Sequence, residues 1–350
     1  MNLPTLKKRG KGSFELSSPV RIEAAASAAG PFEKKGRLRG AFDLTFDDPY
    51  LGEKTWEKAE GSLARRTVAR LYEKSSLSPA ETDFFFAGDL ERQCMASTQG
   101  LLPYDVPYCG LYGACSTFGE GLILASALLD GGFGRAAGVI TTSHFSTAER
   151  EYRTPLVYGK QRQPSAQHTV TGGGAVLLAA GPAPDGEPYA AVTRFRVGRM
   201  RDMGIADPGN MGAAMAPAAA ETLTGFLEDF GRKADDYDLI LTGDLGQVGY
   251  EIVRDLTGAM GFPLGGVYDD CGRLLYHEEQ DAHAGGSGAG CSSLVFVASV
   301  LPRLLRGELK RVLLAPTGAL LSAVSLLQGE SIPGICHLIE VEARSGKEDF

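Results

Sequence analysis

The chain has 350 residues, of which 43% are hydrophobic and 22% charged, and its formal net charge is −8. This balance is typical of a folded globular protein, and the negative charge argues against broad nucleic-acid binding, which needs a basic surface. No apolar run reaches the roughly 18–20 residues that span a bilayer, no apolar signal core is present and the six cysteines form no close pairs, so we expect an intracellular chain with reduced thiols.

Helical segments and apolar strands alternate along the chain. In chain order we expect a helix at 56–71, a strand at 84–87, a helix at 118–129, a strand at 138–142, a helix at 213–230, a strand at 239–241, a helix at 294–305 and a strand at 312–315. This alternation predicts buried sheets that are covered by helices, which is the α/β class. A run rich in glycine and proline at 181–188 is the expected linker between about two domains.

Two sequence patterns occur twice, in the same order. One joins Cys115-Ser116-Thr117 to Gly131, Arg135 and Thr141, and it recurs at identical spacing as Cys291-Ser292-Ser293, Gly307, Arg311 and Thr317. The other is the segment 83–90, which is matched by 238–245. A repeat of this length is far longer than a solenoid unit of roughly 20–50 residues. We therefore expect two domain-sized halves, 1–185 and 186–350, with a ligand site at the seam between them.

Cys115 directly precedes the expected helix at 118–129. A helix N-terminus carries partial positive charge and free N–H groups, which lower the pKa of a thiol and can hold an anion. Cys115 is therefore a candidate nucleophile or ligand-facing residue. An inert buried thiol at a tight turn is the alternative.

The duplication resembles that of the thiolase superfamily, which includes thiolases and ketoacyl synthases. The local segments that carry this resemblance are 113–116 around Cys115, 235–241 and the glycine-rich 284–289. The resemblance implies a duplicated five-layer αβαβα sandwich, and a first-half cysteine that becomes acylated.

The residues that would assist this cysteine in a condensing enzyme do not match. Such enzymes place a His just after the strand that here ends at Thr242 and an Asn in the later glycine-rich loop, where this chain has Gly243 and approximately Gly286. A thiolase-type register would instead make His283 the catalytic partner of Cys115. An active acyltransferase acylated on Cys115 is therefore kept as an alternative.

More of the chain resembles the stage V sporulation protein AD family of spore-forming bacteria. The matching segments are 113–117, 129–133, 143–144, 147–150, 170–172, 211–220, 236–245 and 329–333. This resemblance implies a non-catalytic protein that binds dipicolinic acid (pyridine-2,6-dicarboxylate) and acts with membrane proteins of the dipicolinate channel in its uptake into developing spores. It also implies a homodimer, and a chain associated peripherally with the inner membrane of the forespore or spore. A structural adaptor with a vestigial pocket is a further alternative.

Dipicolinate is flat and carries two carboxylates, so its site should combine cations or N–H donors with a planar apolar slot. The expected loop at 143–162 has such groups, although charged loops are also typical of a solvated face or a dimer contact. Asp89 and Asp244 end the two repeated strands, where each faces the seam or caps a turn or a helix N-terminus. The expected ligand-binding residues are Cys115, Ser143, His144, Arg150, Arg153, Asp89, Gly286 and Ser287. We expect no metal site and no cofactor, and leave open whether Ca²⁺ accompanies the ligand.

Overall fold

The computed structural model describes residues 7–152, 162–181, 183 and 187–345. Its main strands form two five-stranded units. The strands of the first unit are β2 (Ser13–Ala29), β4 (Phe84–Gly88), β5 (Tyr108–Gly110), β6 (Ala136–Ser143) and β8 (Gly172–Ala180). The strands of the second are β9 (Pro188–Arg196), β10 (Leu239–Thr242), β11 (Tyr268–Asp270), β13 (Arg311–Ala315) and β16 (Leu338–Ser345). Shorter strands are β1 (Lys8–Arg9), β3 (Leu44–Thr45), β7 (His168–Thr169), β12 (Gly286–Ser287), β14 (Thr317–Ala319) and β15 (Gly334–Cys336).

The two units have the same topology. The spatial order is β2-β8-β6-β4-β5 in the first unit and β9-β16-β13-β10-β11 in the second. The directions match as well, because β4 is parallel to β5 and β6 as β10 is to β11 and β13, whereas β6 and β13 run antiparallel to β8 and β16. Strands β2 and β9 pair antiparallel and join the units. The sequence repeat is thus a repeat of strand order.

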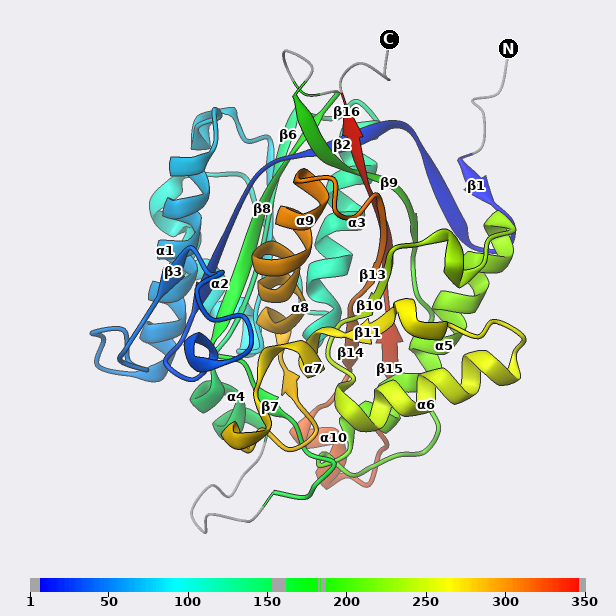
Figure 1. The fold of residues 1–350 in the computed structure, drawn as a ribbon. Coiled ribbons are helices and arrows are strands. Elements are labelled where there is room, and N and C mark those ends of the chain that lie inside the picture. Colours follow the sequence, from blue (N-terminus) through cyan, green and yellow to red (C-terminus); the bar gives the residue numbers. More distant parts are fainter. Residues whose placement is uncertain (1–6, 153–161, 182, 184–186, 346–350) are drawn as a thin grey trace.

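Helices cover both sheet units and fill the space between them (Figure 1). The helices are α1 (Trp56–Lys74), α2 (Met95–Leu101), α3 (Thr117–Asp130), α4 (Phe145–Tyr152), α5 (Met211–Phe230), α6 (Gly246–Ala259), α7 (Cys271–Leu275), α8 (Ala289–Val295), α9 (Leu301–Leu305) and α10 (Ala323–Leu327). Helices α1 and α2 pack outside the first unit, α5 and α6 pack outside the second, and α3, α8 and α9 lie between the two. This arrangement confirms the predicted αβαβα sandwich.

Each expected helix and strand has a counterpart in the structure, with one difference in the segment after β6. Residues 145–152 of the expected loop form α4. The backbone N–H of Phe145 donates to Thr171 Oγ1 at 3.0 Å, and that of Ala148 donates to the His144 carbonyl at 3.1 Å. The cap at Thr171 comes from a distant part of the chain, so local sequence did not reveal the helix.

The repeated aspartates 83 and 238 explain part of the sequence echo. Asp83 Oδ2 accepts two successive backbone N–H groups, those of 135–136, at 2.6 and 3.1 Å. Asp238 Oδ2 does the same for 310–311, at 2.7 and 2.9 Å. In each half the aspartate therefore ties the start of one strand to the start of its parallel neighbour.

Glycines let α8 lie directly on β8. A Cβ on Gly290 would come within 2.1 Å of the Gly172 carbonyl oxygen, and one on Gly174 within 2.4 Å of the Ser293 carbonyl oxygen. The Ser293 hydroxyl also accepts from the Gly174 N–H at 3.0 Å. This close approach brings the N-terminal end of α8 to the seam, where α3 also begins.

Candidate functional site

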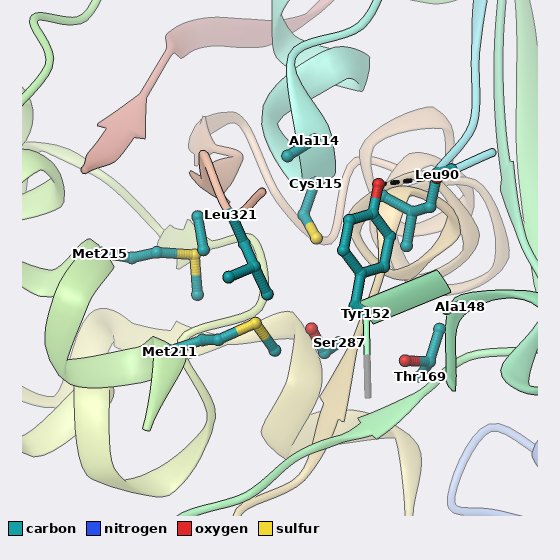
Figure 2. A pocket seen from close by; sticks show the side chains of 11 residues that line it. Leu90, Ala114, Cys115, Ala148, Tyr152, Thr169, Met211, Met215, Ser287 and Leu321 are labelled. Atoms are coloured by element: carbon teal, nitrogen blue, oxygen red, sulfur yellow. Dashed lines mark hydrogen bonds between the residues drawn. The ribbon is translucent and has the colours of Figure 1, made fainter. Parts of the chain in front are cut away.

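A pocket lies where the two halves meet at the start of α3. It encloses about 520 Å³ of empty space, part of which is open solvent. The first half contributes Leu90, Ala114, Cys115, Ala148, Tyr152 and Thr169, and the second contributes Met211, Met215, Ser287, Ala319 and Leu321. Figure 2 shows the Cys115 sulfur and the Ser287 hydroxyl pointing into the space between Met211, Leu321 and Tyr152. The pocket therefore has mostly apolar walls and a small polar end.

Cys115 is positioned by a strained turn. Ala114 has a φ of +52°, in the left-handed region that residues with a Cβ rarely adopt. Side-chain hydrogen bonds hold the turn, because Ser116 Oγ donates to the Gly113 carbonyl and Thr117 Oγ1 to the Ala114 carbonyl, both at 2.7 Å. The thiol is consequently fixed at the N-terminal end of α3, facing the second half.

Asp244, at the end of β10, is the charged residue behind the polar end of the pocket. Its carboxylate accepts from Thr317 Oγ1 at 2.9 Å, from Ser287 Oγ at 2.9 Å and from the Gly288 N–H at 3.1 Å. The Cys115 thiol lies beside this carboxylate. Asp244 is 1% exposed, so these neutral donors replace the water that a carboxylate would otherwise bind.

This environment keeps the thiol protonated. Burial raises the pKa of Cys115 well above its usual value, and the nearby charge of Asp244 raises the pKa further. Both effects oppose the N-terminal end of α3, which on its own would lower the pKa of a thiol. Burial raises the pKa of Asp244 as well, against the hydrogen bonds that it receives.

The two candidate histidines lie outside the pocket lining. His283 Nδ1 is 3.3 Å from Asp281 Oδ1 in a separate polar cleft, which Tyr276 and Arg273 also line. His144 is buried, with Nε2 2.8 Å from the Pro49 carbonyl oxygen. Among the described residues that line the pocket none is a histidine, so no imidazole faces the thiol there.

Of the expected ligand-binding residues, Cys115 and Ser287 come together in the pocket. Ser143 Oγ instead donates to the Val170 carbonyl at 2.7 Å, and the Gly286 carbonyl accepts from Gln167 Nε2 at 3.0 Å. Asp89 accepts from the Ser97 N–H at 2.7 Å at the start of α2. These three residues support neighbouring backbone and do not line the pocket.

Arg150 also lies outside the pocket lining. Its guanidinium pairs with Glu57 and lies 5.8 Å from the centre of the Trp56 ring. Ala148 and Tyr152, on the opposite side of α4, line the pocket instead. Arg153 lies outside the described residues.

The sequence places Asp244 at the seam or at a turn but did not assign it to the ligand site, and sequence reasoning missed the apolar wall of Met211, Met215 and Leu321. The signal for Asp244 was its place at the end of a repeated strand. The signal for the two methionines was their spacing of four residues at the start of a helix. No group of three or more His, Cys, Asp or Glu side chains within the described ranges is arranged to hold a metal ion.

Comparison with known proteins identifies the family. A family model described as stage V sporulation protein AD matches residues 10–342. The chain belongs to the stage V sporulation protein AD family. A relative in Bacillus subtilis (strain 168), named stage V sporulation protein AD, is 42% identical over 341 residues, which cover 97% of this chain and 99% of the relative. As a member of this family, the chain is a sporulation protein.

Solved structures establish that the stage V sporulation protein AD fold is thiolase-like. Cerulenin-bound OleA from Xanthomonas campestris aligns with a TM-score of 0.60 and 14% identity over 93% of this chain and 99% of that one. The 3-oxoacyl-[acyl-carrier-protein] synthase III of Aquifex aeolicus VF5 aligns with a TM-score of 0.54 and 14% identity over 92% and 99%. At these identities the likeness shows the fold alone. Across the described ranges, no helix has the length and apolarity to cross a bilayer.

Proposed function

We propose that the chain binds dipicolinic acid in the pocket beside Cys115 and has no catalytic role there. Membership of the stage V sporulation protein AD family supports a role in sporulation. The pocket lies between the halves, where ligand sites commonly form, and residues from both halves line it. The ligand would be held for uptake into the developing spore.

The pocket walls suit a flat aromatic ring. Met211 and Leu321 face Tyr152 across the space shown in Figure 2. Methionine side chains adapt to the outline of a ring and make favourable sulfur contacts with it. Cys115 lines the pocket at the N-terminal end of α3, whose partial positive charge favours a nearby ligand carboxylate.

The position of the buried Asp244 carboxylate beside the Cys115 thiol is the observation that carries the non-catalytic proposal. Nucleophilic catalysis requires a thiolate, and a buried carboxylate beside a thiol disfavours that form. A condensing enzyme would need a proton acceptor and oxyanion donors in this position. The pocket lining supplies neither a histidine nor an asparagine within the described residues.

Calorimetric titration of the purified protein with dipicolinate tests this proposal, with benzoate as the control for generic carboxylate binding. The titration is run with and without Ca²⁺, because dipicolinate chelates this ion. We expect saturable, selective binding near one ligand per chain. Incubation with acyl-thioesters followed by intact mass measurement tests the alternative of an active acyltransferase, which requires a stoichiometric adduct on Cys115.

We also propose that the chain forms a homodimer through β5. This strand ends the sheet path and all three of its residues are exposed. An unpaired edge strand is a template for pairing with a second chain, and Tyr108 and Tyr112 add exposed aromatic surface beside it. Sedimentation equilibrium should give twice the mass of one chain.

Membrane proteins of the dipicolinate channel are the proposed partners at the inner membrane of the forespore or spore. An apolar surface suitable for such a contact lies beside α10, where Leu327 is 90% exposed and Val324 is 55% exposed. The neighbouring segment adds Met200 and Met203, both more than 60% exposed. Co-purification of the channel proteins with the wild-type chain, and its loss when Leu327 is replaced by Glu, tests this contact.

A further inference from the structure

The polar end of the pocket offers hydrogen-bond acceptors. Ser287 Oγ donates its hydrogen to Asp244 Oδ2 at 2.9 Å, and the Cys115 thiol lies beside the same carboxylate. An ionised carboxylate only accepts hydrogen bonds, so the Ser287 hydrogen is turned toward Asp244, and the charge of the carboxylate attracts the Cys115 thiol hydrogen in the same direction. Their lone pairs are consequently what the serine oxygen and the cysteine sulfur present to a ligand.

The other polar side chains that line the pocket add little to balance these acceptors. The Tyr152 hydroxyl donates to the Leu90 carbonyl at 2.7 Å, which Figure 2 shows as a dashed line. Among the polar lining residues of the described ranges, only Thr169 has a hydroxyl hydrogen that is not engaged with a described protein acceptor. One hydroxyl cannot compensate for a fully ionised carboxylate that is placed against the Ser287 and Cys115 lone pairs.

The carboxylate and the thiols that surround Asp244 are negatively charged or neutral. Asp270, from β11, lies close enough to interact electrostatically with Asp244, and it accepts from the Leu245 and Gly246 N–H groups at 2.9 Å each. The thiols of Cys115 in the turn before α3, Cys271 in α7 and Cys291 in α8 are close enough to Asp244 to feel its charge, and burial raises the pKa of each well above its usual value. No Lys or Arg donates to Asp244 among the hydrogen bonds of the described residues.

From this geometry we infer that the pocket binds an aromatic acid together with one proton, and that Asp244 causes this selectivity. In the complex the proton is shared between a ligand carboxyl group and the Asp244 carboxylate with its hydrogen-bond partners. This inference rests on the proposed function, because it concerns the form in which dipicolinate is bound. Two carboxylates in one buried site cannot both stay ionised, and a single shared proton converts their repulsion into a hydrogen bond. The proton resides either on the ligand or on Asp244. If it resides on Asp244, Ser287 and Cys115 are free to turn their hydrogens toward the ligand.

Calorimetry across pH, in buffers of different ionisation enthalpy, measures the protons taken up with dipicolinate. We expect uptake of about one proton per ligand and an affinity that falls about tenfold per pH unit once both the free ligand and Asp244 of the free protein are ionised. The neutral analogue pyridine-2,6-dicarboxamide carries its own N–H donors, so its binding to the wild-type chain should not vary with pH. This second probe requires no substitution.

The Asp244→Asn variant tests the residue directly. Asparagine keeps the shape of the side chain but removes its charge, so it no longer repels a ligand carboxylate. The Gly288 N–H donates to Oδ2, so the asparagine oxygen takes this position and still accepts from Ser287, while the amide faces Thr317 Oγ1. The variant should bind the dianion with little pH dependence. Glu33→Gln is the matched control, because Glu33 is an equally buried carboxyl group that does not line the pocket, and its pH profile should equal that of the wild type.

The possible outcomes separate this inference from the proposed function. Dipicolinate binding without proton uptake and with constant affinity across pH would overturn the inference and leave the proposed function standing. No binding of dipicolinate at any pH would overturn both. Proton uptake that persists unchanged in Asp244→Asn would also overturn the inference, because the linked proton would then belong to another group.

Discussion

Asp89 and Asp244 occupy equivalent positions at the ends of β4 and β10, but only Asp244 reaches the pocket thiol. Asp89 accepts from the N–H and hydroxyl groups of Ser97, at 2.7 and 2.6 Å, and holds the start of α2. Asp244 instead lies beside the Cys115 thiol of the first half and accepts from Ser287 of the second. The duplication thus produced two carboxylates at equivalent positions, and the packing of the two halves places only Asp244 beside the pocket.

Replacement of Cys115 by Ser should leave dipicolinate affinity within about threefold of the wild type, because a serine hydroxyl also donates to Asp244. The matched variant Leu321→Trp, which fills the pocket from its partly exposed wall, should weaken binding by more than tenfold, about 1.4 kcal/mol. Calorimetric titration of both variants provides the measurement. Equal loss in the two would mean that the thiol itself contacts the ligand in a way that oxygen cannot replace.

Much of the fold can be predicted from the sequence, because it depends on local patterns. The alternation of helices with apolar strands indicates the α/β class, and the repeated segments 83–90 and 238–245 indicate the shared strand order. Cys115 is recognisable as a site residue by its place before a helix. Each of these features is encoded in a short stretch of chain, so it can be recognised without knowing how the two halves pack together.

The remainder of the site depends on contacts between distant residues. Cys115 and Asp244 are far apart in sequence, and only the stacking of the two halves brings them together. The direction of the Arg150 side chain likewise depends on the helical conformation of α4. In this helix Ala148 and Tyr152 are four residues apart, so they share the face that lines the pocket. Arg150 lies midway between them and is therefore on the opposite face, toward Glu57. When the segment is interpreted as a loop, its sequence does not show which of these side chains face the pocket.

Gly290→Ala should destabilise the fold, because its Cβ would lie 2.1 Å from the Gly172 carbonyl oxygen and would force α8 away from β8. We expect a loss of about 1–3 kcal/mol in the free energy of unfolding. The control is Gly258→Ala, since Gly258 lies in α6 and a Cβ added there would have no atom within 4 Å. That change should stabilise the fold by about 0.5–1 kcal/mol. Urea denaturation measures both, and a neutral Gly290→Ala would argue against close packing of α8.

Cysteine alkylation should distinguish the surface thiol from the pocket thiol. Cys109 is exposed on β5 and should react first with iodoacetamide in dilute protein, whereas Cys115 is buried with a raised pKa and should react slowly. Pairing of β5 between two chains would protect Cys109 as the protein concentration rises. Mass spectrometry of each cysteine peptide provides the measurement. Concentration-independent labelling of Cys109 would remove β5 from the dimer interface, and rapid labelling of Cys115 would contradict its protonated state.

Glu33 should make stability fall as pH rises. Burial raises the pKa of Glu33 to about 7, against the hydrogen bonds from Tyr276 and from the Thr171 N–H. Between the ordinary glutamate pKa, about 4.3, and pH 7 the unfolded chain loses this proton while the folded chain keeps it. The stabilising contribution is therefore fully present below that range and is lost by about 3 kcal/mol as pH rises through it.

The Glu33→Gln variant isolates this effect from other titrating groups. Glutamine can keep the oxygen that accepts from Tyr276 and Thr171, at 2.6 and 3.1 Å, and place its amide where Oε2 has no described partner. The variant should match the wild type near pH 4.5 and be about 3 kcal/mol more stable at pH 7.5. Urea denaturation of both proteins across pH measures the difference. A difference that stays constant with pH would show that Glu33 is ionised in the folded chain, with water or a cation at its second oxygen.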